Sequence, residues 1–360
     1  MLKKRILFDI CHPAEVHHFK HLYAELLQNQ WVVLFAAKRK DVTEELLLEY
    51  NLPFIIFSNN QTGLWRKIIY LPVELWRFHS LIRKFQPSII ISNLSIHSSW
   101  ISWIHRIPHI AFVDTEERSL LDLITVPFAQ AKLTGQSYYG KLGRHHCSYP
   151  GNHELAYLHP NRFRPDHSIQ SELGLCEDEP FVIVRFIAWQ AFHDVGLTHM
   201  NLHERLQLIR MISKKKRVFI STESLLPADL ESYRFPLPAG RLHDALAFAD
   251  LYVGEGSTMA SEAAVLGTPA VLINSRRMGY CLEEEKQGLI FMFDSLSENA
   301  LEKIAELLDL PNVKTAFQVK HKLFMRDKID VTSFMTWFIE SYPESLEMLR
   351  KDPSLVHGFV

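Results

Sequence analysis

The sequence predicts two α/β domains, each with a parallel β-sheet covered by helices on both faces. The chain has 360 residues, which is longer than the size at which one hydrophobic core usually stops growing. Apolar runs of strand length alternate with amphipathic stretches through most of the chain. Two stretches rich in turn-forming residues, 149–152 and 159–166, separate two such alternating sets. We therefore expect one domain at 1–160 and a second at 161–330.

Each expected element has the length and the periodicity of its type. In the first domain, strands are expected at 6–10, 31–36, 54–57, 89–92 and 109–113, and helices at 18–28, 42–50 and 98–105. In the second domain, strands are expected at 181–186, 218–221, 251–253 and 270–273, and helices at 201–213, 243–249, 258–266 and 298–309. Open parallel sheets bind their ligands at the carboxyl ends of the strands, so we expect a substrate cleft between the two domains.

Composition limits the classes of function. The chain is 47% hydrophobic and carries 39 basic and 41 acidic residues, a net charge of −2, so it offers nucleic acid no general attraction. The four cysteines are far apart and form no Cys-x-x-Cys pair, which favours a reducing compartment over a disulfide framework or a zinc ribbon. The apolar start at 6–8 is too short for a secretion signal, and histidine, arginine and proline interrupt the apolar stretch 100–113. A cytoplasmic protein is expected.

The run 251–273 is the most informative part of the chain. It predicts a strand, a glycine turn, a short helix that ends near Gly267, and a second buried strand. Gly254 and Gly256 would leave backbone N–H groups exposed where the helix begins, and such an end attracts phosphate. Glu262, one turn into the helix, could accept hydrogen bonds from two ribose hydroxyls. The alternative is an ordinary βαβ unit in which the glycines only allow close packing.

Arg185 ends a nearly all-apolar strand in the second domain. An arginine at that position is costly to bury unless an anion meets it, and phosphate fits its forked donors. The alternative is an ion pair with Glu223 or Glu255 from neighbouring strand ends. His193 and Asp194, which follow shortly after, add an imidazole and a carboxylate to the same region.

An acidic cluster follows the expected strand at 109–113 and contains Asp114, Glu116 and Glu117. Burial beside a like charge would raise the pKa of one of these carboxyls toward the range of a general acid or base. The alternative is a capping segment, because this sequence also suits the first turn of a helix.

Four histidines, His12, His17, His18 and His21, crowd the junction between the first strand and the first helix. His17 and His21 are spaced to share a helical face and could ligate a metal. No acidic third ligand stands at a recognised spacing, so we expect no metal site and no cofactor. We expect His12 or His17 to face the cleft as hydrogen-bonding or acid/base groups.

The segment 64–85 mixes aromatic, aliphatic and basic residues, with Glu74 as its one acidic residue. It suggests a peripheral membrane face or a groove for a lipid-linked acceptor. The alternative is a helix packed in the core, whose basic side chains bury their apolar stems and extend their charged ends to solvent.

These passages resemble a known group of proteins. The run 254–269 is similar to the nucleotide-sugar signature of GT-B enzymes, which include UDP-N-acetylglucosamine 2-epimerases. More closely, the passages 9–19, 150–154, 185–196 and 254–269 resemble a prokaryotic family of GT-B-like proteins of unknown function. The resemblance implies a GT-B-like fold of two Rossmann-type domains that face each other across a cleft. It also implies C-terminal helices at 331–360, of which 331–342 would cross back to the first domain.

The resemblance also implies roles for individual residues. In GT-B enzymes the corresponding helix start holds the diphosphate and its glutamate binds ribose, which carries these roles to Ser257, Thr258 and Glu262. In the 2-epimerases a His-x-Glu-Ala-Gly-Leu-Arg element follows the fifth strand and supplies a catalytic acid. Here residues 113–118 keep an acid but not the glycine, and residues 254–257 replace the epimerases' Asp-Ser-Gly-Gly. Both departures argue against epimerase chemistry.

We therefore expect a glycosyltransferase that moves a sugar from a nucleotide-diphosphate sugar to a glycan or lipid-linked acceptor, in the cytoplasm or at the inner face of the cell membrane. A sugar 2-epimerase and a non-catalytic nucleotide-sugar-binding protein are the alternatives. The expected catalytic residues are Asp114, Glu116, His17 and His193. The expected nucleotide-sugar-binding residues are Arg185, Gly254, Glu255, Gly256, Ser257, Thr258 and Glu262. The expected acceptor-side residues are His12, Glu117 and Asp194.

Overall fold

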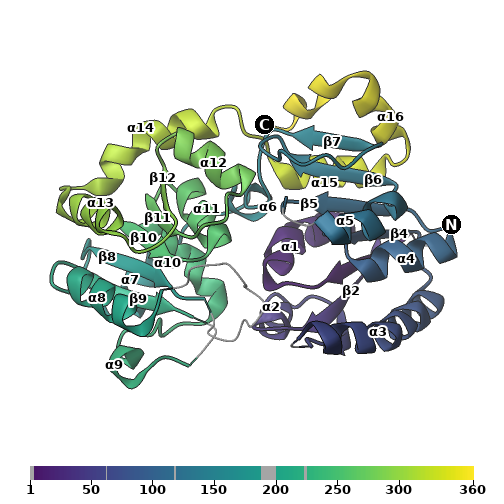
Figure 1. Cartoon of the computed structure of the whole chain (residues 1–360). Coiled ribbons are helices and arrows are strands. Elements are labelled where there is room, and N and C mark those ends of the chain that lie inside the picture. Colours follow the sequence, from purple (N-terminus) through teal and green to yellow (C-terminus); the bar gives the residue numbers. More distant parts are fainter. Residues whose placement is uncertain (1–3, 62, 117–118, 188–199, 223–224) are drawn as a thin grey trace. The chain divides into compact units, whose positions relative to one another are not determined.

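The computed structural model describes residues 4–61, 63–116, 119–187, 200–222 and 225–360. It divides into two compact units (Figure 1). Unit 1 comprises Met1–Arg162 and Lys328–Val360, and unit 2 comprises Phe163–Asp327. Each unit contains one β-sheet in which every described strand pairing is parallel. The predicted fold class of two parallel-sheet α/β domains is confirmed.

The sheet of unit 1 has seven strands. They are β1 (Arg5–Ile10), β2 (Val32–Arg39), β3 (Phe54–Asn59), β4 (Ile89–Ser92), β5 (His109–Val113), β6 (Ala131–Gly135) and β7 (His146–Tyr149). Their order is β3-β2-β1-β4-β5-β6-β7. Successive strands are added on one side of β1 as far as β3 and then on its other side from β4 onward. The reversal therefore lies between β1 and β4, and ligands of such sheets bind at the carboxyl ends of the strands there.

Helices cover both faces of this sheet. They are α1 (Pro13–Gln28), α2 (Thr43–Glu49), α3 (Leu64–Phe85), α4 (Ile96–His105), α5 (Ser119–Thr125), α6 (Leu155–Leu158), α15 (Val331–Glu340) and α16 (Glu344–Lys351), with 3-10 turns η1 (Val126–Phe128) and η3 (Pro353–Gly358). The right-handed crossovers before and after the reversal place α1 and α2 on one face and α3, α4 and α5 on the other. In agreement, α1 packs against α2, α6 and α15, whereas α4 packs against α3 and α5.

The core of unit 1 explains why these segments form its layers. Leu7, Ala36 and Ile90 come from three neighbouring strands, and Phe78 and Ile101 come from α3 and α4; together they form one buried apolar cluster. Burial of this kind contributes roughly 1.5–3 kcal/mol for each large side chain.

The C-terminal segment belongs to unit 1. Arg162 pairs with Asp330, Nε to Oδ2 at 2.7 Å, and also with Glu25 of α1. Thr336 of α15 donates a hydrogen bond to the same Glu25. These contacts fasten 328–360 to α1 and to the end of the first segment.

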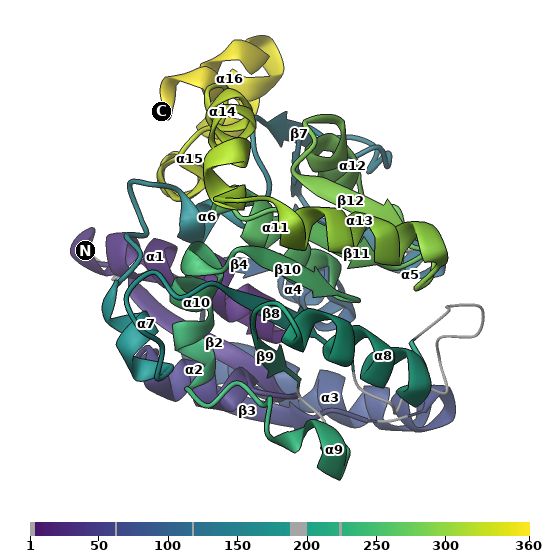
Figure 2. The same cartoon turned by 90° about the vertical axis from the view of Figure 1, so that its left-hand side faces the viewer.

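The sheet of unit 2 has five strands. They are β8 (Phe181–Arg185), β9 (Arg217–Ser221), β10 (Leu251–Gly254), β11 (Ala270–Ile273) and β12 (Ile290–Phe293). Figure 2 shows their order, β12-β11-β10-β8-β9. Here the chain reverses between β8 and β10, so Arg185 and Gly254 end the two strands at the reversal.

The helices of unit 2 follow the same plan. They are α7 (Ser168–Glu172), α8 (Leu202–Ser213), α9 (Ala228–Glu231), α10 (Leu242–Phe248), α11 (Ser257–Val265), α12 (Gly279–Lys286), α13 (Glu298–Asp309) and α14 (Val313–Met325), with the 3-10 turn η2 (Ala239–Arg241). Gly267 has φ +80° just past the end of α11, which confirms the predicted glycine stop of that helix. Among the described residues, no helix is both long enough and apolar enough to span a membrane.

Candidate functional site

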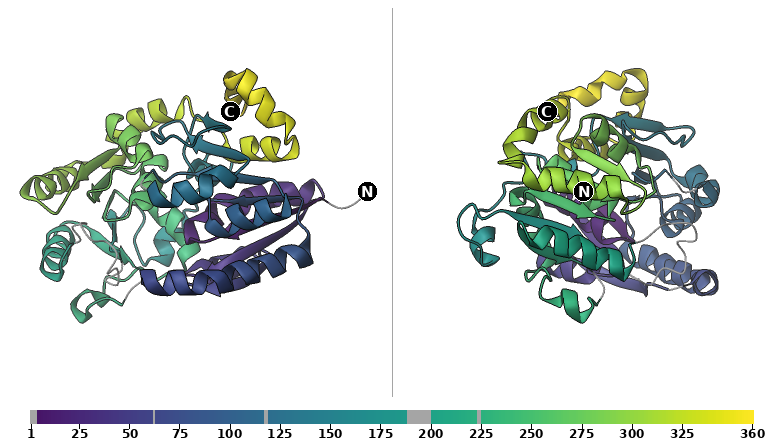
Figure 3. Two further views of the ribbon diagram at one scale, coloured as in Figure 1. Left: turned by 45° about the vertical axis from the view of Figure 1, so that its right-hand side comes forward. Right: turned by 60° about the vertical axis from the view of Figure 1, so that its left-hand side comes forward.

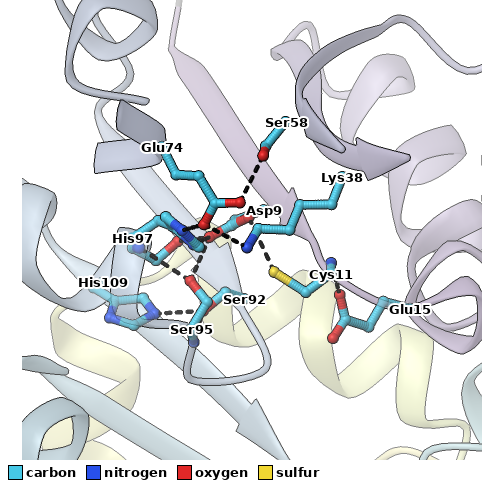
Figure 4. A network of polar contacts seen from close by, with 11 residues as sticks. Asp9, Cys11, Glu15, Lys38, Ser58, Glu74, Ser92, Ser95, His97 and His109 are labelled. Carbon is cyan, nitrogen blue, oxygen red and sulfur yellow. Dashed lines mark hydrogen bonds and ion pairs between the residues drawn. The ribbon is translucent and has the colours of Figure 1, made fainter. Parts of the chain in front are cut away.

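The carboxyl end of β1 carries a buried carboxylate at the reversal of the unit 1 sheet. Asp9 is fully buried, and its Oδ2 accepts hydrogen bonds from Ser98 Oγ at 2.8 Å and from Ser95 Oγ (Figure 4). Cys11 Sγ lies 3.6 Å from Asp9 Oδ1. Ser95 also caps α4, with its Oγ 3.0 Å from the Ser98 nitrogen. The Asp9 charge therefore lies at the positive end of α4, where it is stabilised.

A second buried carboxylate, Glu74 of α3, faces the same site. It accepts from Ser58 Oγ at 2.6 Å and from Lys38 Nζ at 2.8 Å, and its Oε2 lies 3.1 Å from His97 Nε2. Burial acts to raise the pKa of Glu74, but the hydrogen bonds from His97, Lys38 and Ser58 outweigh it and lower the pKa to about 2. His97 Nδ1 lies 4.0 Å from Asp9 Oδ2. The imidazole thus lies close to both carboxylates (Figure 4).

Asp9, Cys11 and His97 could hold a metal ion, because each offers a ligand atom within 4.8 Å of the others. Two features of the site oppose this use. The Asp9 carboxylate already accepts hydrogen bonds from two serines. Burial and the charges of Asp9 and Glu15 raise the pKa of the Cys11 thiol, so a metal would have to displace the thiol proton to gain this ligand. The cluster fits a hydrogen-bonded network better than a cation.

Glu15 is an acid in this region that the sequence analysis did not select. It lies in the first turn of α1, is buried, and accepts a hydrogen bond from the Cys11 nitrogen at 2.7 Å. Burial, followed by the charges of Asp9 and Asp114, raises its pKa to about 8. A carboxyl that keeps its proton at neutral pH can donate it to a substrate. In the sequence, an acid at this position predicts only helix capping.

Asp114 forms a second polar cluster beyond the end of β5. Its Oδ1 accepts from Asn93 Nδ2 and from Thr115 Oγ1, both at 3.0 Å, and its Oδ2 lies 3.3 Å from His153 Nδ1. Burial acts to raise the pKa of Asp114, but the charge and hydrogen bond of His153, with the bonds from Asn93 and Thr115, hold it well below its usual range. The raised pKa expected for an acid of this cluster is therefore wrong for Asp114, which stays ionised.

His153 and His18 complete this cluster. Their rings stack with centroids 4.0 Å apart. Burial, together with the nearby His153, lowers the pKa of His18 well below its usual range, so His18 is neutral. His153 Nε2 and His18 Nε2 are buried and have no hydrogen-bond partner within the described parts of the chain. Buried polar atoms are nearly always paired in folded proteins, so two unpaired imidazole nitrogens mark a place where a ligand can bind.

The other residues selected in unit 1 lie elsewhere. His12 is exposed and caps α1 through its Nδ1, which accepts from the Ala14 nitrogen at 3.2 Å. His17 Nδ1 lies 3.2 Å from the Tyr50 hydroxyl, on the side of α1 that contacts α2 and α6. Glu116 is half-buried and directly follows the Asp114 cluster. Glu117, His193 and Asp194 lie outside the described residues.

In unit 2, the strand β10 leads into the predicted glycine turn. A Cβ at Gly254 would lie 2.7 Å from the Arg185 carbonyl oxygen and 2.8 Å from the Arg185 Cβ, so only glycine fits where β10 passes β8. A Cβ at Gly256 would meet only Arg185 Cγ at 3.5 Å and the Tyr252 hydroxyl at 3.4 Å. That hydroxyl donates to the Gly256 carbonyl at 3.0 Å and fixes the turn. Close packing therefore explains Gly254, while Gly256 sets the start of α11 beside the Arg185 side chain.

Glu255 has a structural role that the sequence analysis did not expect. It is almost fully buried, and its carboxylate accepts from Arg205 Nη2 at 2.9 Å, from the Met200 nitrogen at 2.8 Å and from the Ile187 nitrogen at 3.1 Å. These contacts join β10 to the residues on either side of 188–199. These donors contact both carboxylate oxygens, so Glu255 positions the turn after β10.

The remaining residues selected in unit 2 surround the start of α11. Arg185 Nη1 donates to Ser221 Oγ at 3.0 Å, and the described ion pair of Glu255 is with Arg205 rather than with Arg185. Within the described ranges no side chain caps α11, and its first two residues, Ser257 and Thr258, are partly exposed. Glu262 Oε1 lies 3.0 Å from His243 Nε2 in a buried pair. Glu223 lies outside the described residues.

Comparison with known proteins places the chain among uncharacterised sequences with a well-known fold. A family described as a protein of unknown function, DUF354, matches residues 4–280. An uncharacterized protein of Methanocaldococcus jannaschii is 23% identical over 287 residues, which cover 75% of this chain and 82% of that protein.

Among solved structures, a UDP complex of MnaA from S. aureus aligns with a TM-score of 0.69 at 11% identity, over 95% of this chain and 97% of that chain. UDP-GlcNAc 2-epimerase from Neisseria meningitidis, bound to UDP-GlcNAc, gives 0.64 at 12% identity, over 93% and 99%. The spinosyn forosaminyltransferase SpnP gives 0.59 at 14% identity, over 98% and 99%. At such identities the likeness shows the fold, which is that of GT-B glycosyltransferases and UDP-GlcNAc 2-epimerases. The chain belongs to the DUF354 family of proteins of unknown function.

Proposed function

We propose that the protein is a GT-B-type glycosyltransferase. It would move a sugar from a nucleotide-diphosphate sugar to a glycan or lipid-linked acceptor in the synthesis of surface polysaccharide or another glycoconjugate. The observation that carries the proposal is the place of Arg185 beside the start of α11, at the reversal of the unit 2 sheet. Forked guanidinium donors and free helix N–H groups are both suited to phosphate oxygens.

In this proposal the rest of the nucleotide sugar binds around the start of α11. Ser257 and Thr258 would bind the diphosphate through their hydroxyls and backbone nitrogens, and Glu262 would bind ribose. Two structures of similar fold hold UDP and UDP-GlcNAc, which supports a uridine nucleotide. At a ligand concentration of about 100 Kd, binding would stabilise the fold by about 2.7 kcal/mol.

Unit 1 would supply the proton chemistry. Because Asp114 is ionised, it holds a proton on Nδ1 of His153, and in the neutral form of this imidazole Nε2 would be the proton acceptor. An acceptor hydroxyl held at this nitrogen would lose its proton to His153 as it attacks the sugar, and Asp114 would stabilise the imidazolium that forms. Glu15, protonated at neutral pH, would donate a hydrogen bond or a proton on the same side of the sheet.

The test is a thermal-shift screen across nucleotide sugars, followed by turnover with a glycan or lipid-linked acceptor. We expect a nucleotide sugar to raise the melting temperature of the wild type, and Arg185→Gln to remove most of this shift. We also expect release of the nucleoside diphosphate to depend on the acceptor. If no nucleotide sugar shifts the melting temperature, the proposal fails.

A UDP-GlcNAc 2-epimerase-like reaction is the second candidate. It is favoured by the buried acid Glu15 and the base His153, since epimerisation at C2 needs a group that removes a proton and one that returns it. Incorporation of deuterium at C2 of the sugar, in D2O and without an acceptor, would favour the epimerase proposal over the transferase proposal. Binding of a nucleotide sugar with neither reaction would leave a non-catalytic binding protein.

A further inference from the structure

The helix α3 exposes apolar side chains that a water-facing helix normally lacks. Trp65 is 78% exposed, Ile69 is 69% exposed and Trp76 is 68% exposed. Positions 65, 69 and 76 are spaced by four and seven residues, so they share one face of the helix. The opposite face carries Phe78, which is buried in the core of unit 1. The core-helix alternative of the sequence analysis therefore accounts for only one side of α3.

The exposed apolar surface continues over the neighbouring helices. Trp103 of α4 is 60% exposed, and Leu120 and Leu123 of α5 are 78% and 72% exposed. The helices α3, α4 and α5 cover the same face of the unit 1 sheet, α4 contacts both of the others, and Figure 3 shows them beside one another. We call the outward sides of these three helices the aromatic face. Single exposed apolar residues are normal on a protein surface, but several large ones on three contacting helices indicate an interaction site.

The α3 part of the aromatic face is positively charged, whereas α5 carries one acid, Asp122. Arg66, Arg77 and Lys84 are exposed on α3 and are spaced by eleven and seven residues, so they form a row beside the tryptophans. The single carboxylate of the helix, Glu74, is buried on the other side, where it binds Lys38. The outward side of α3 therefore carries cations and no carboxylate.

A shallow hollow lies at the end of α4 on this face. Its volume is about 690 Å³, and its lining consists of Trp103, Ile104, Arg106, Ile107, Pro108 and Gln130. Apolar walls with one guanidinium suit a lipid, whose acyl chain is apolar and whose phosphate is an anion.

We propose that the aromatic face docks unit 1 onto an anionic lipid bilayer. Tryptophan is favoured at the membrane–water interface, where aliphatic residues can enter the acyl region and cations can meet anionic headgroups. Charge selects this occupant over a second copy of the chain, because a two-fold dimer through this face would bring its cations close together. The inference goes beyond the proposed function and does not depend on nucleotide-sugar binding.

The test is flotation of the full chain with vesicles of phosphatidylcholine alone or with 30% phosphatidylglycerol, in the absence of nucleotide sugar. We expect binding to the anionic vesicles that weakens with salt. The double variant Trp65→Gln/Trp76→Gln should lose at least tenfold in vesicle affinity. The double variant Arg66→Gln/Lys84→Gln should lose about fivefold per cation on anionic vesicles and change little on neutral ones.

A matched control comes from unit 2, where Val319 and Leu323 are exposed apolar residues of α14, one turn apart. Val319→Gln/Leu323→Gln should float as the wild type does. An unchanged melting temperature shows that each variant is folded. Absence of wild-type flotation would overturn the proposal, as would equal binding of the tryptophan variant. A wild-type dimer in light scattering that the tryptophan variant dissociates, without vesicle binding, would assign the aromatic face to a second copy instead.

Discussion

The carboxyl edges of the two sheets share a topology but differ in the side chains that they bury. At the unit 1 edge, the buried carboxyl groups of Asp9, Glu15 and Glu74 lie near histidines and serines. Of these, Glu15 holds a proton at neutral pH. At the unit 2 edge, a glycine turn and Arg185 stand beside a helix start, and the nearest buried acid, Glu255, is bound to Arg205. The first edge gathers ionisable side chains, whereas the second places a guanidinium beside a helix N-terminus. Two sheets of the same topology thus differ in the ionisable side chains at their strand ends.

The largest difference between the edges should be seen in catalysis. We expect His153→Asn to lower turnover by about 10²–10⁴-fold, because it removes the proposed proton acceptor, while the thermal shift by a nucleotide sugar stays as in the wild type. Release of the nucleoside diphosphate measures turnover. The exposed His357→Asn serves as the control and should keep full activity. Turnover within threefold of the wild type in the His153 variant would remove this residue from the mechanism.

The next effect should be confined to unit 2. Glu255→Ala removes the carboxylate that the buried Arg205 binds, and loss of one member of a buried ion pair costs about 3–5 kcal/mol. Hydrogen exchange should show lost protection in β10 and α8, with β1 of unit 1 unchanged. The exposed Glu302→Ala should change neither. Equal loss of protection in both units would show that they do not unfold separately, and no loss in either would mean that the ion pair does not stabilise the turn.

A smaller effect should distinguish the acid of unit 1. The folded state holds the Glu15 proton up to a pKa of about 8, whereas the usual value is 4.5. Unfolding therefore releases a proton between these values, and this carboxyl lowers stability as pH rises through the window, by roughly 1.4 kcal/mol per pH unit at most. Glu15→Gln should be more stable relative to the wild type at pH 8 than at pH 5 in urea unfolding.

The exposed Glu45→Gln, from the first turn of α2, is the control for this comparison. It should leave the pH dependence of unfolding unchanged. The same slope in the Glu15 variant and the wild type would show that Glu15 is ionised in the folded protein.

Much of the fold could be predicted because local patterns match the final structure. The fully buried strands β1, β8 and β10 appear as apolar runs, and Gly267 ends α11 as its position suggested. Three strands at or next to a sheet edge were not predicted from the sequence. β6 carries Lys132 in its centre, β7 has the polar sequence His-Cys-Ser-Tyr, and β12 is short and partly exposed, so none shows a clear apolar period.

Less of the site could be predicted, because it depends on contacts between distant segments. Arg185 and Gly254 were selected correctly as the ends of adjacent strands, since strand ends can be identified along the chain. His153 follows β7, a strand that was not predicted, and meets Asp114 only through the order of β5, β6 and β7. Likewise, the raised pKa of Glu15 comes from burial and from two carboxylates on other elements. Neither cause is visible in a local pattern.

The central claim is that unit 2 binds a nucleoside diphosphate at Arg185 and the start of α11. Isothermal titration of the whole chain with UDP measures it most directly, with Arg185→Gln and the control Arg217→Gln, an exposed arginine at the opposite end of the neighbouring strand β9. We expect one site per chain, a loss of at least tenfold in affinity for the Arg185 variant, and no change for the control. Binding of UDP that is equal in all three proteins, or no binding to the wild type, would contradict the account.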